Sequence, residues 1–508
     1  MESLPAVGPS IWTASSPTTA YPSLSVDQAV DAAVIGGGIT GLTTALLLLR
    51  QGLRVVLLEA DRIASSTTGH TTAKLSSLHG LTYASLADDH GDDTARLYGR
   101  ANQAAIETVV RLARDNDIAC DIERMPAFTY AETEELAGSV EREVETARRL
   151  GLPASLVKET DLPFPVKAAI RMGDQAMFHP RKYCIGLARA FAAEGGRLFE
   201  RTPVLGIEEG APHKVVTAHG TVTARHVVQA TQFPFYDTFG FFTVNVPHQS
   251  YGLAVVYESP APKGMFLSAE APTHSIRPFR DGERNYLILG GEGHRVGRDP
   301  DTALRYAALE EWAHRTFDTG APSYRWSAHD YVPKDGLPYI GKLSPDSEGL
   351  WIGTGFKKWG LTNGTVAALI LSDLIAGREN PWAPAFDSLR LKPKSSAGKL
   401  LQRQVELEKQ SQGPPITGEW PVEANELPSG KGRVIKSGGE KLAVYRDESG
   451  DFHAVSAVCT HMGCDVAFNT AEKTWDCPCH GSRFDVNGRV IHGPAVRELK
   501  PFHTVGDR

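Results

Sequence analysis

Two cysteine–histidine pairs near the end of the chain have the spacing of a metal site. One residue separates Cys459 from His461, two separate Cys477 from His480, and fifteen lie between the pairs. Two thiolates and two imidazoles suit a [2Fe–2S] cluster in which the thiolates bind one iron and the imidazoles bind the other. A zinc site with two cysteines and two histidines uses the same ligand types, so zinc stays an alternative.

A glycine-rich turn near the start of the chain predicts a second site. Residues 36–41 read G-G-G-I-T-G, after an expected strand and at the start of an expected helix. Gly36 would make the tight turn, Gly38 would let the backbone approach a pyrophosphate, and Gly41 would let helix and strand pack closely. Glu59 ends the next expected strand and could accept hydrogen bonds from ribose hydroxyls. The early position and the lack of a second such motif favour FAD over NAD.

Composition places the chain among ordinary globular proteins of several domains. It has 508 residues, 22% charged residues and a net charge of −7. This length predicts two to four domains. The negative charge argues against nucleic acid or an anionic membrane as a partner. We expect a cytoplasmic protein without a membrane span, because no signal-peptide pattern or bilayer-length apolar run is present.

Changes of pattern along the sequence predict four segments. An irregular arm over residues 1–30 precedes an α/β dinucleotide-binding domain with an inserted α+β substrate domain over 31–385. A polar linker is expected over 386–415. A small all-β domain, with short strands and Gly/Asp/Asn turns, is expected over 416–508.

The region from about residue 30 to 385 resembles the D-amino-acid oxidase/glycine oxidase/sarcosine oxidase family of flavoproteins. The likeness lies in the glycine turn and in residues 202–208, 227–231, 336–341, 353–356 and 360–364. It implies a Rossmann-like, glutathione-reductase-type FAD-binding domain. The resemblance implies FAD contacts at Gly36, Gly38, Ile39, Thr40, Gly41, Glu59, Arg62, Ser66, Thr67, His70, Val204, Gly353, Gly355, Gly360, Leu361 and Thr362. The family usually has Ala-Thr-Gly where this chain has Ala-Thr-Gln, ending at Gln232.

His70 lies in a Ser/Thr-rich segment, residues 65–72, that is similar to one in dimethylglycine-dehydrogenase-type flavoproteins. There, a histidine bonds covalently to the flavin 8α-methyl group. This chain has Gly69 in place of the usual tryptophan, and covalent attachment, a non-covalent flavin contact and a structural role all stay open. A yellow pellet after acid precipitation would show the covalent bond, and a colourless pellet would exclude it.

The C-terminal region resembles the Rieske [2Fe–2S] family. The resemblance implies one cluster held by Cys459, His461, Cys477 and His480, and a disulfide between Cys464 and Cys479. It also implies that Ser482 donates to a bridging sulfide and that residues 493–495 form a third loop over the cluster. Phe484 stands where high-potential members have tyrosine, whereas low-potential members lack the second cysteine pair. We therefore expect an intermediate potential on a scale of about −150 to +300 mV.

These resemblances together imply a flavin-dependent dehydrogenase acting on a CH–NH group of an amine or amino-acid-like substrate. Electrons would leave through the cluster to an external one-electron acceptor. The candidate catalytic residues are Lys357, Lys358, Tyr251 and Arg277, with Arg277 as the partner of a substrate carboxylate. Each of the four could instead be an ordinary surface or structural residue.

Two alternatives stay open. The cluster could receive electrons from an external donor while the flavin carries out a reduction or an O2-dependent hydroxylation or demethylation. The chain could also be a non-catalytic electron-transfer or redox-sensing protein. The sequence identifies neither the substrate nor the electron partner.

Overall fold

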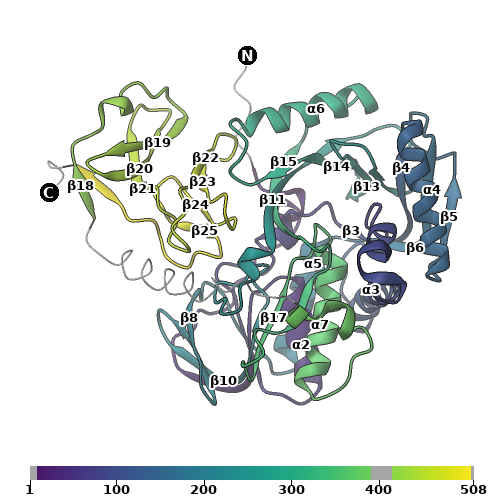
Figure 1. Ribbon diagram of the computed structural model, residues 1–508, viewed down its shortest axis with the longest axis horizontal. Coiled ribbons are helices and arrows are strands. Elements are labelled where there is room, and N and C mark those ends of the chain that lie inside the picture. Colours follow the sequence, from purple (N-terminus) through teal and green to yellow (C-terminus); the bar gives the residue numbers. More distant parts are fainter. Residues whose placement is uncertain (1–7, 391–414, 505–508) are drawn as a thin grey trace.

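The structure, a computed structural model, describes residues 8–390 and 415–504. It contains a large domain (8–390) and a smaller C-terminal domain (415–504) that packs against one side of it (Figure 1). Most of the predicted linker, residues 391–414, lies outside the described residues. Its first part belongs to the large domain, because the Arg390 guanidinium donates to the Asp335 carboxylate at 2.9 Å.

The first sheet of the large domain carries the predicted strand–turn–helix unit. Strands β1 (Gln28–Ile35), β2 (Val55–Leu58), β7 (Arg197–Phe199), β10 (Thr221–Gln229) and β17 (Leu350–Thr354) run parallel, and β16 (Tyr339–Lys342), β8 (Val204–Glu208) and β9 (His213–Thr217) extend it antiparallel. In β1, Ala32 and Val34 pack in one apolar core while Ala33 and Ile35 pack in another. The strand is apolar on both faces because both faces are covered.

The second sheet is the predicted substrate domain. Its main path is β15 (Tyr324–Pro333), β11 (Asn245–Val256), β14 (Arg284–Arg295), β13 (Ser275–Asp281), β12 (Met265–Ser268), β4 (Glu123–Ala131), β6 (Ala168–Met177) and β3 (Lys74–Leu75), with β5 (Ala154–Val157) beside β6. β15 is therefore an edge strand of this sheet.

Helices cover these sheets and bring glycine-rich turns to one place. They are α1 (Ile11–Ala14), α2 (Ile39–Arg50), α3 (Tyr83–Asp115), α4 (Glu134–Arg149), α5 (Pro180–Ala193), α6 (Ala303–Phe317), α7 (Gly360–Ile375) and α8 (Ala383–Phe386), with short 3-10 turns η1 (Thr67–His70), η2 (Phe241–Thr243) and η3 (Ser388–Arg390). α2 and α7 pack side by side, and a Cβ on Gly364 would lie 2.4 Å from the Thr40 hydroxyl oxygen. This contact brings the N-terminal ends of α2 and α7 together.

The C-terminal domain consists of small β-sheets, as predicted. One contains β19 (Lys431–Ser437), β20 (Glu440–Arg446) and β21 (Phe452–Ser456), another β22 (Ala467–Asn469), β23 (Thr474–Asp476), β24 (Arg483–Phe484) and β25 (Val490–His492). β18 (Ile416–Gly418) pairs with β26 (Phe502–Thr504), and η4 (Val422–Ala424) follows β18. The loops between β21 and β22 and between β23 and β24 carry the two cysteine–histidine motifs.

The N-terminal segment is more ordered than the irregular arm expected from its composition. In its described part, α1 spans Ile11–Ala14 and β1 begins at Gln28. Trp12 is fully buried, and its indole Nε1 donates to the Thr71 carbonyl oxygen at 2.6 Å. Burial of an aromatic side chain fixes this segment beneath η1. Among the described residues, none of the helices combines the length and apolarity needed to span a bilayer.

Candidate active site and cluster site

The glycine turn between β1 and α2 is packed too tightly for side chains. Gly36 has a φ of +111°, and a Cβ there would lie 2.5 Å from the Ala230 carbonyl oxygen. A Cβ on Gly41 would lie 1.9 Å from the Gly36 carbonyl oxygen. The Glu59 carboxylate, just after β2, accepts the Gly37 N–H at 2.6 Å. Gly38, Ile39 and Thr40, at the start of α2, line the adjoining cavity, and a helix N-terminus in this position suits a pyrophosphate.

A cavity of about 540 Å³ adjoins this turn. Its walls come from α2, η1, the start of α7 and the strands β11, β13, β14 and β15. It brings together ten residues singled out from the sequence: Gly38, Ile39, Thr40, Thr67, His70, Tyr251, Lys357, Lys358, Gly360 and Leu361. Segments from four distant parts of the chain thus meet in one space that fits a flavin and a substrate.

The other predicted contacts of this site do not line the cavity. They are Gly36, Gly41, Glu59, Arg62, Ser66, Val204, Gly353, Gly355, Thr362 and Arg277. Arg62 donates to the Thr19 carbonyl oxygen and lies 3.5 Å from the Glu200 carboxylate. The glycines stand behind the cavity wall, where they allow the turns to pack.

Arg277 points into the protein interior. Its guanidinium donates to the Ala73 carbonyl oxygen and stacks on Trp12 and Phe279, at 5.1 and 5.6 Å from the ring centroids. The side chain is 1% exposed. This placement does not support the predicted contact with a substrate carboxylate. Arg277 instead holds the N-terminal segment against the substrate sheet.

The turn between β17 and α7 is strained and borders the cavity. Lys357 and Lys358 have φ values of +51° and +67°, a left-handed conformation that costs non-glycine residues free energy. The Lys357 N–H donates to the Tyr331 carbonyl oxygen at 3.0 Å, and the Asn363 amide donates to the Phe356 carbonyl oxygen at 3.1 Å. These bonds hold the turn and point the N-terminus of α7 toward the cavity, where it would favour negative charge on a bound ring.

Gln232 lines the cavity, and the sequence had already marked it as a departure from the family pattern. It replaces the usual glycine of the family and keeps a positive φ of +66°, so the expected backbone shape is retained. Its amide Nε2 donates to the His329 carbonyl oxygen at 2.7 Å, and its Oε1 accepts from the Thr67 hydroxyl at 2.9 Å. The glutamine therefore ties η1 to β15 across the cavity wall.

Four ionisable lining residues were not singled out from the sequence: Lys74, His79, His248 and Asp330. Burial lowers the pKa of Lys74 to about 7, helped by the nearby charge of Arg277. Burial raises the pKa of Asp330 to about 6, and it lowers that of Lys358, which Asp330 partly offsets. Nothing in their local sequence pattern marks these residues, because their burial arises from long-range packing.

Tyr251 faces the cavity from the substrate sheet. Its hydroxyl lies 2.8 Å from His294 Nε2, and burial raises its pKa. The tyrosine is therefore a protonated, oriented group in the cavity wall.

The four predicted cluster ligands converge in the C-terminal domain. Cys459 and Cys477 are buried free thiols, close enough to hydrogen-bond to each other. The rings of His461 and His480 have centroids 5.1 Å apart. Both nitrogens of His461 and Nδ1 of His480 are buried and have no hydrogen-bond partner among the described residues. Since buried polar groups are normally paired, these nitrogens fit a bound metal.

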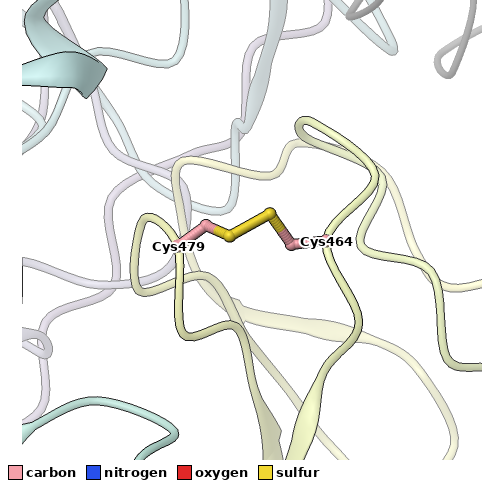
Figure 2. The surroundings of a disulfide bond; sticks show 2 residues. All are labelled: Cys464 and Cys479. Atoms are coloured by element: carbon pink, nitrogen blue, oxygen red, sulfur yellow. A yellow bond between two sulfur atoms is a disulfide. The ribbon is translucent and has the colours of Figure 1, made fainter.

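A disulfide joins the two ligand loops, as the resemblance implied. Cys464 and Cys479 form the bond, each within five residues of the cysteine ligand candidate in its loop (Figure 2). The sulfur atoms of Cys464, Cys477 and Cys479 lie within 4.8 Å of one another. Because the disulfide occupies two of these sulfurs, Cys477 is the one that stays available as a thiolate.

The C-terminal domain contacts the large domain through a buried polar network. Arg483 pairs with Glu472 at 2.6 Å and Asp476 at 3.0 Å, and it donates to His329 Nε2 at 2.9 Å. His329 Nδ1 in turn donates to the Gly481 carbonyl oxygen at 3.2 Å. Burial lowers the pKa of His329 well below its usual range, so the ring is neutral, as this bonding pattern requires.

Two family models match the chain in the regions that contain these sites. Residues 31–374 match FAD dependent oxidoreductase, and residues 420–503 match the Rieske [2Fe-2S] domain. The chain is a FAD-dependent oxidoreductase with a C-terminal Rieske domain. Its cofactors are FAD and a [2Fe–2S] cluster, which decides against the zinc alternative.

Individual proteins agree with this assignment. The Bacillus subtilis (strain 168) protein YhfW, which carries the name of a Rieske 2Fe-2S iron-sulfur protein, is 35% identical over 494 residues and covers 96% of each chain. Gamma-glutamylputrescine oxidoreductase of Escherichia coli (strain K12) is 26% identical over 377 residues, 70% of this chain and 86% of the other. The glycine oxidase structure from Geobacillus kaustophilus has a TM-score of 0.61 at 20% identity, over 72% of this chain and all of that one. The oxidoreductase fold of the large domain is thereby confirmed.

Replacing the buried cavity lysine should stabilise the protein in a pH-dependent way. The pKa of Lys74 is about 7 in the folded protein, against 10.5 for an ordinary lysine, so the unfolded chain holds the extra proton between these two pH values. Wild-type stability should therefore rise with pH across this window. Lys74→Met should be more stable by up to about 4 kcal/mol at pH 7, with no gain by pH 10.5. Urea unfolding at pH 7 and pH 10 measures this. The exposed Lys214→Met is the control, and an equal effect at both pH values would contradict the prediction.

Removing the disulfide should destabilise the Rieske domain. Its cysteines are separated by 15 positions, and a loop of that length contributes about 3 kcal/mol to the unfolding free energy. The Cys464→Ser/Cys479→Ser variant should unfold at a lower temperature and lose its visible cluster absorbance faster. A strong reductant should bring the wild type toward the same behaviour. Unchanged melting and cluster lifetime would show that the bond does not brace the site.

Proposed function

We propose that this oxidoreductase dehydrogenates an amine or amino-acid-like substrate at FAD and releases the electrons singly through the Rieske cluster to an external acceptor. In this proposal Cys459, His461, Cys477 and His480 hold the cluster. When bound, FAD accepts a hydride from the substrate C–H beside nitrogen, and the cluster accepts one electron at a time. The remaining substrate imine would be hydrolysed by water.

One strand, β15, separates the cavity from the Rieske domain, and this observation carries the proposal. Ala328, Asp330 and Val332 point to one face and line the cavity. His329 and Tyr331 point to the opposite face and bond to the Rieske loop at Gly481 and His480. Successive side chains alternate between the two faces of a strand, so both sites share a wall one strand thick. The arrangement suits electron transfer within one chain.

The histidine side of the cluster site faces the large domain, which is the flavoprotein domain. The Phe233 ring lies 5.9 Å from the His480 ring and 6.4 Å from the His461 ring, and Phe242 lies 5.7 Å from His480. The two histidines are 3% and 9% exposed. A cluster held here would have the flavin domain as its immediate neighbour. This favours the flavin as one of its two electron partners.

The cavity leaves room for a small substrate between the substrate sheet and the turn at the start of α7. Small residues along β11 and β14 leave room between the substrate sheet and the turn between β17 and α7, which we call the flavin turn. They include Gly252, Gly290 and Gly293. A Cβ on Gly293 would lie 2.7 Å from Lys358 Nζ, so Lys358 reaches across the cavity to the substrate sheet. We propose Lys358, Lys357 and Tyr251 as substrate-positioning residues. The similarity to gamma-glutamylputrescine oxidoreductase supports an amine or amino-acid-like class.

Anaerobic mixing with a panel of amines and amino acids tests the direction of electron flow. The substrate should bleach the flavin absorbance first, and the cluster absorbance should fall afterwards. In Cys477→Ser, which lacks one thiolate ligand, the substrate should still bleach the flavin. Turnover with an external one-electron acceptor should be lost, because the flavin then has no one-electron exit.

Cys120→Ala is the matched control, since it removes a buried free thiol that lies far along the chain from the cluster loops. It should keep both flavin reduction and acceptor turnover. Cluster reduction by an external donor, followed by electron flow to the flavin, without any substrate that bleaches the flavin, would contradict the proposal.

A further inference from the structure

Tyr331 contacts both cofactor sites. Its carbonyl oxygen accepts the Lys357 N–H of the flavin turn at 3.0 Å. Its hydroxyl donates to the carbonyl oxygen of His480, the cluster ligand candidate, at 2.9 Å. Its ring packs on Phe233 with centroids 4.6 Å apart. A single residue therefore contacts both the flavin turn and the loop between β23 and β24, which we call the cluster loop.

The cluster loop is shaped to receive this side chain. Gly481 has a φ of +74°, and a Cβ there would lie 2.9 Å from the Tyr331 hydroxyl oxygen. The next carbonyl of the loop, that of Gly481, accepts a hydrogen bond from His329. Two alternate residues of β15 thus bind two consecutive carbonyls of the loop. This close approach requires glycine at position 481.

The Tyr331 hydroxyl is a fixed donor in an apolar setting. The residue is fully buried, and its hydroxyl donates to the His480 carbonyl oxygen. Its hydrogen points at the carbonyl of a cluster ligand candidate. A hydrogen-bond donor beside a metal site stabilises added negative charge, and it does so more strongly where water is excluded. The electron that reduces a cluster is such a charge.

We propose that Tyr331 is a positioning residue that raises the reduction potential of the cluster from across the domain boundary and connects it to the flavin turn. The connection to electron transfer rests on the proposed function. The effect on potential does not, because it depends only on the hydroxyl and the loop that it binds. A tyrosine of the large domain thereby raises the reduction potential of the cluster in the C-terminal domain.

Tyr331→Phe tests this, because it removes the hydroxyl and keeps the ring. The readouts are the cluster midpoint potential, followed by electron paramagnetic resonance during a redox titration, and the rate of cluster reduction after flavin reduction. One hydrogen bond is worth about 0.5–1.5 kcal/mol, a factor of about two to ten in the reduced-to-oxidised ratio. The potential should fall by the equivalent of about 20–60 mV for one electron, and the reduction of the cluster should become slower.

Tyr306→Phe is the matched control. It removes a buried hydroxyl that lies 3.5 Å from Glu472 across the same boundary but contacts neither ligand loop carbonyl. It should leave the potential unchanged. If Tyr331→Phe fails to hold a cluster, 3-fluorotyrosine at position 331 gives a stronger donor and should shift the potential upward.

The measurements test the role of Tyr331 and the proposed function separately. An unchanged potential in Tyr331→Phe, with iron content and melting temperature like the wild type, overturns the inference even if the wild type passes electrons from substrate to cluster. A lowered potential supports it even if no substrate reduces the wild-type cluster, which would instead overturn the proposed function.

Discussion

The buried ion pairs of Arg483 are the interaction on which the arrangement of the two cofactor sites depends. Arg483 is only 9% exposed, and its partners Asp476 and Glu472 come from the same domain. A buried charge that loses its partner is strongly destabilising. Arg483 Nη2 also donates to His329 Nε2 of the large domain. The network is complete only when the Rieske domain lies against β15, and this fixes the orientation of the cluster loop.

Strand β15 borders both the flavin cavity and the cluster site. Facing the flavin cavity, β15 presents Asp330 beside Lys358; facing the cluster, it presents His329 and Tyr331. Its backbone also supports the strained Lys357–Lys358 turn, since the Tyr331 carbonyl accepts the Lys357 N–H. Strain of this kind persists only where the surroundings over-determine it. One strand therefore contacts both the Rieske domain and the turn that borders the flavin cavity.

Local patterns predicted much of the fold and part of the site. The glycine turn at Gly36 and the parallel strand unit were readable because each depends on neighbours in sequence. The disulfide between Cys464 and Cys479 was expected only from the resemblance to the Rieske family. Arg277 shows where such reasoning failed. Its residue type suggested a carboxylate partner, but residues more than 200 positions away, Ala73 and Trp12, hold its guanidinium in the interior.

The sequence by itself predicted the two cofactors, because their ligands and turns are short motifs whose geometry is set by adjacent residues. It also marked Gln232, where a non-glycine residue takes a position that needs a positive φ. Only the tertiary structure decided how the cofactor sites face each other. Strand alternation directs Asp330 and Tyr331 to opposite faces of β15. Long-range packing places the flavin cavity on one face, and a buried charge network between the domains places the Rieske domain on the other.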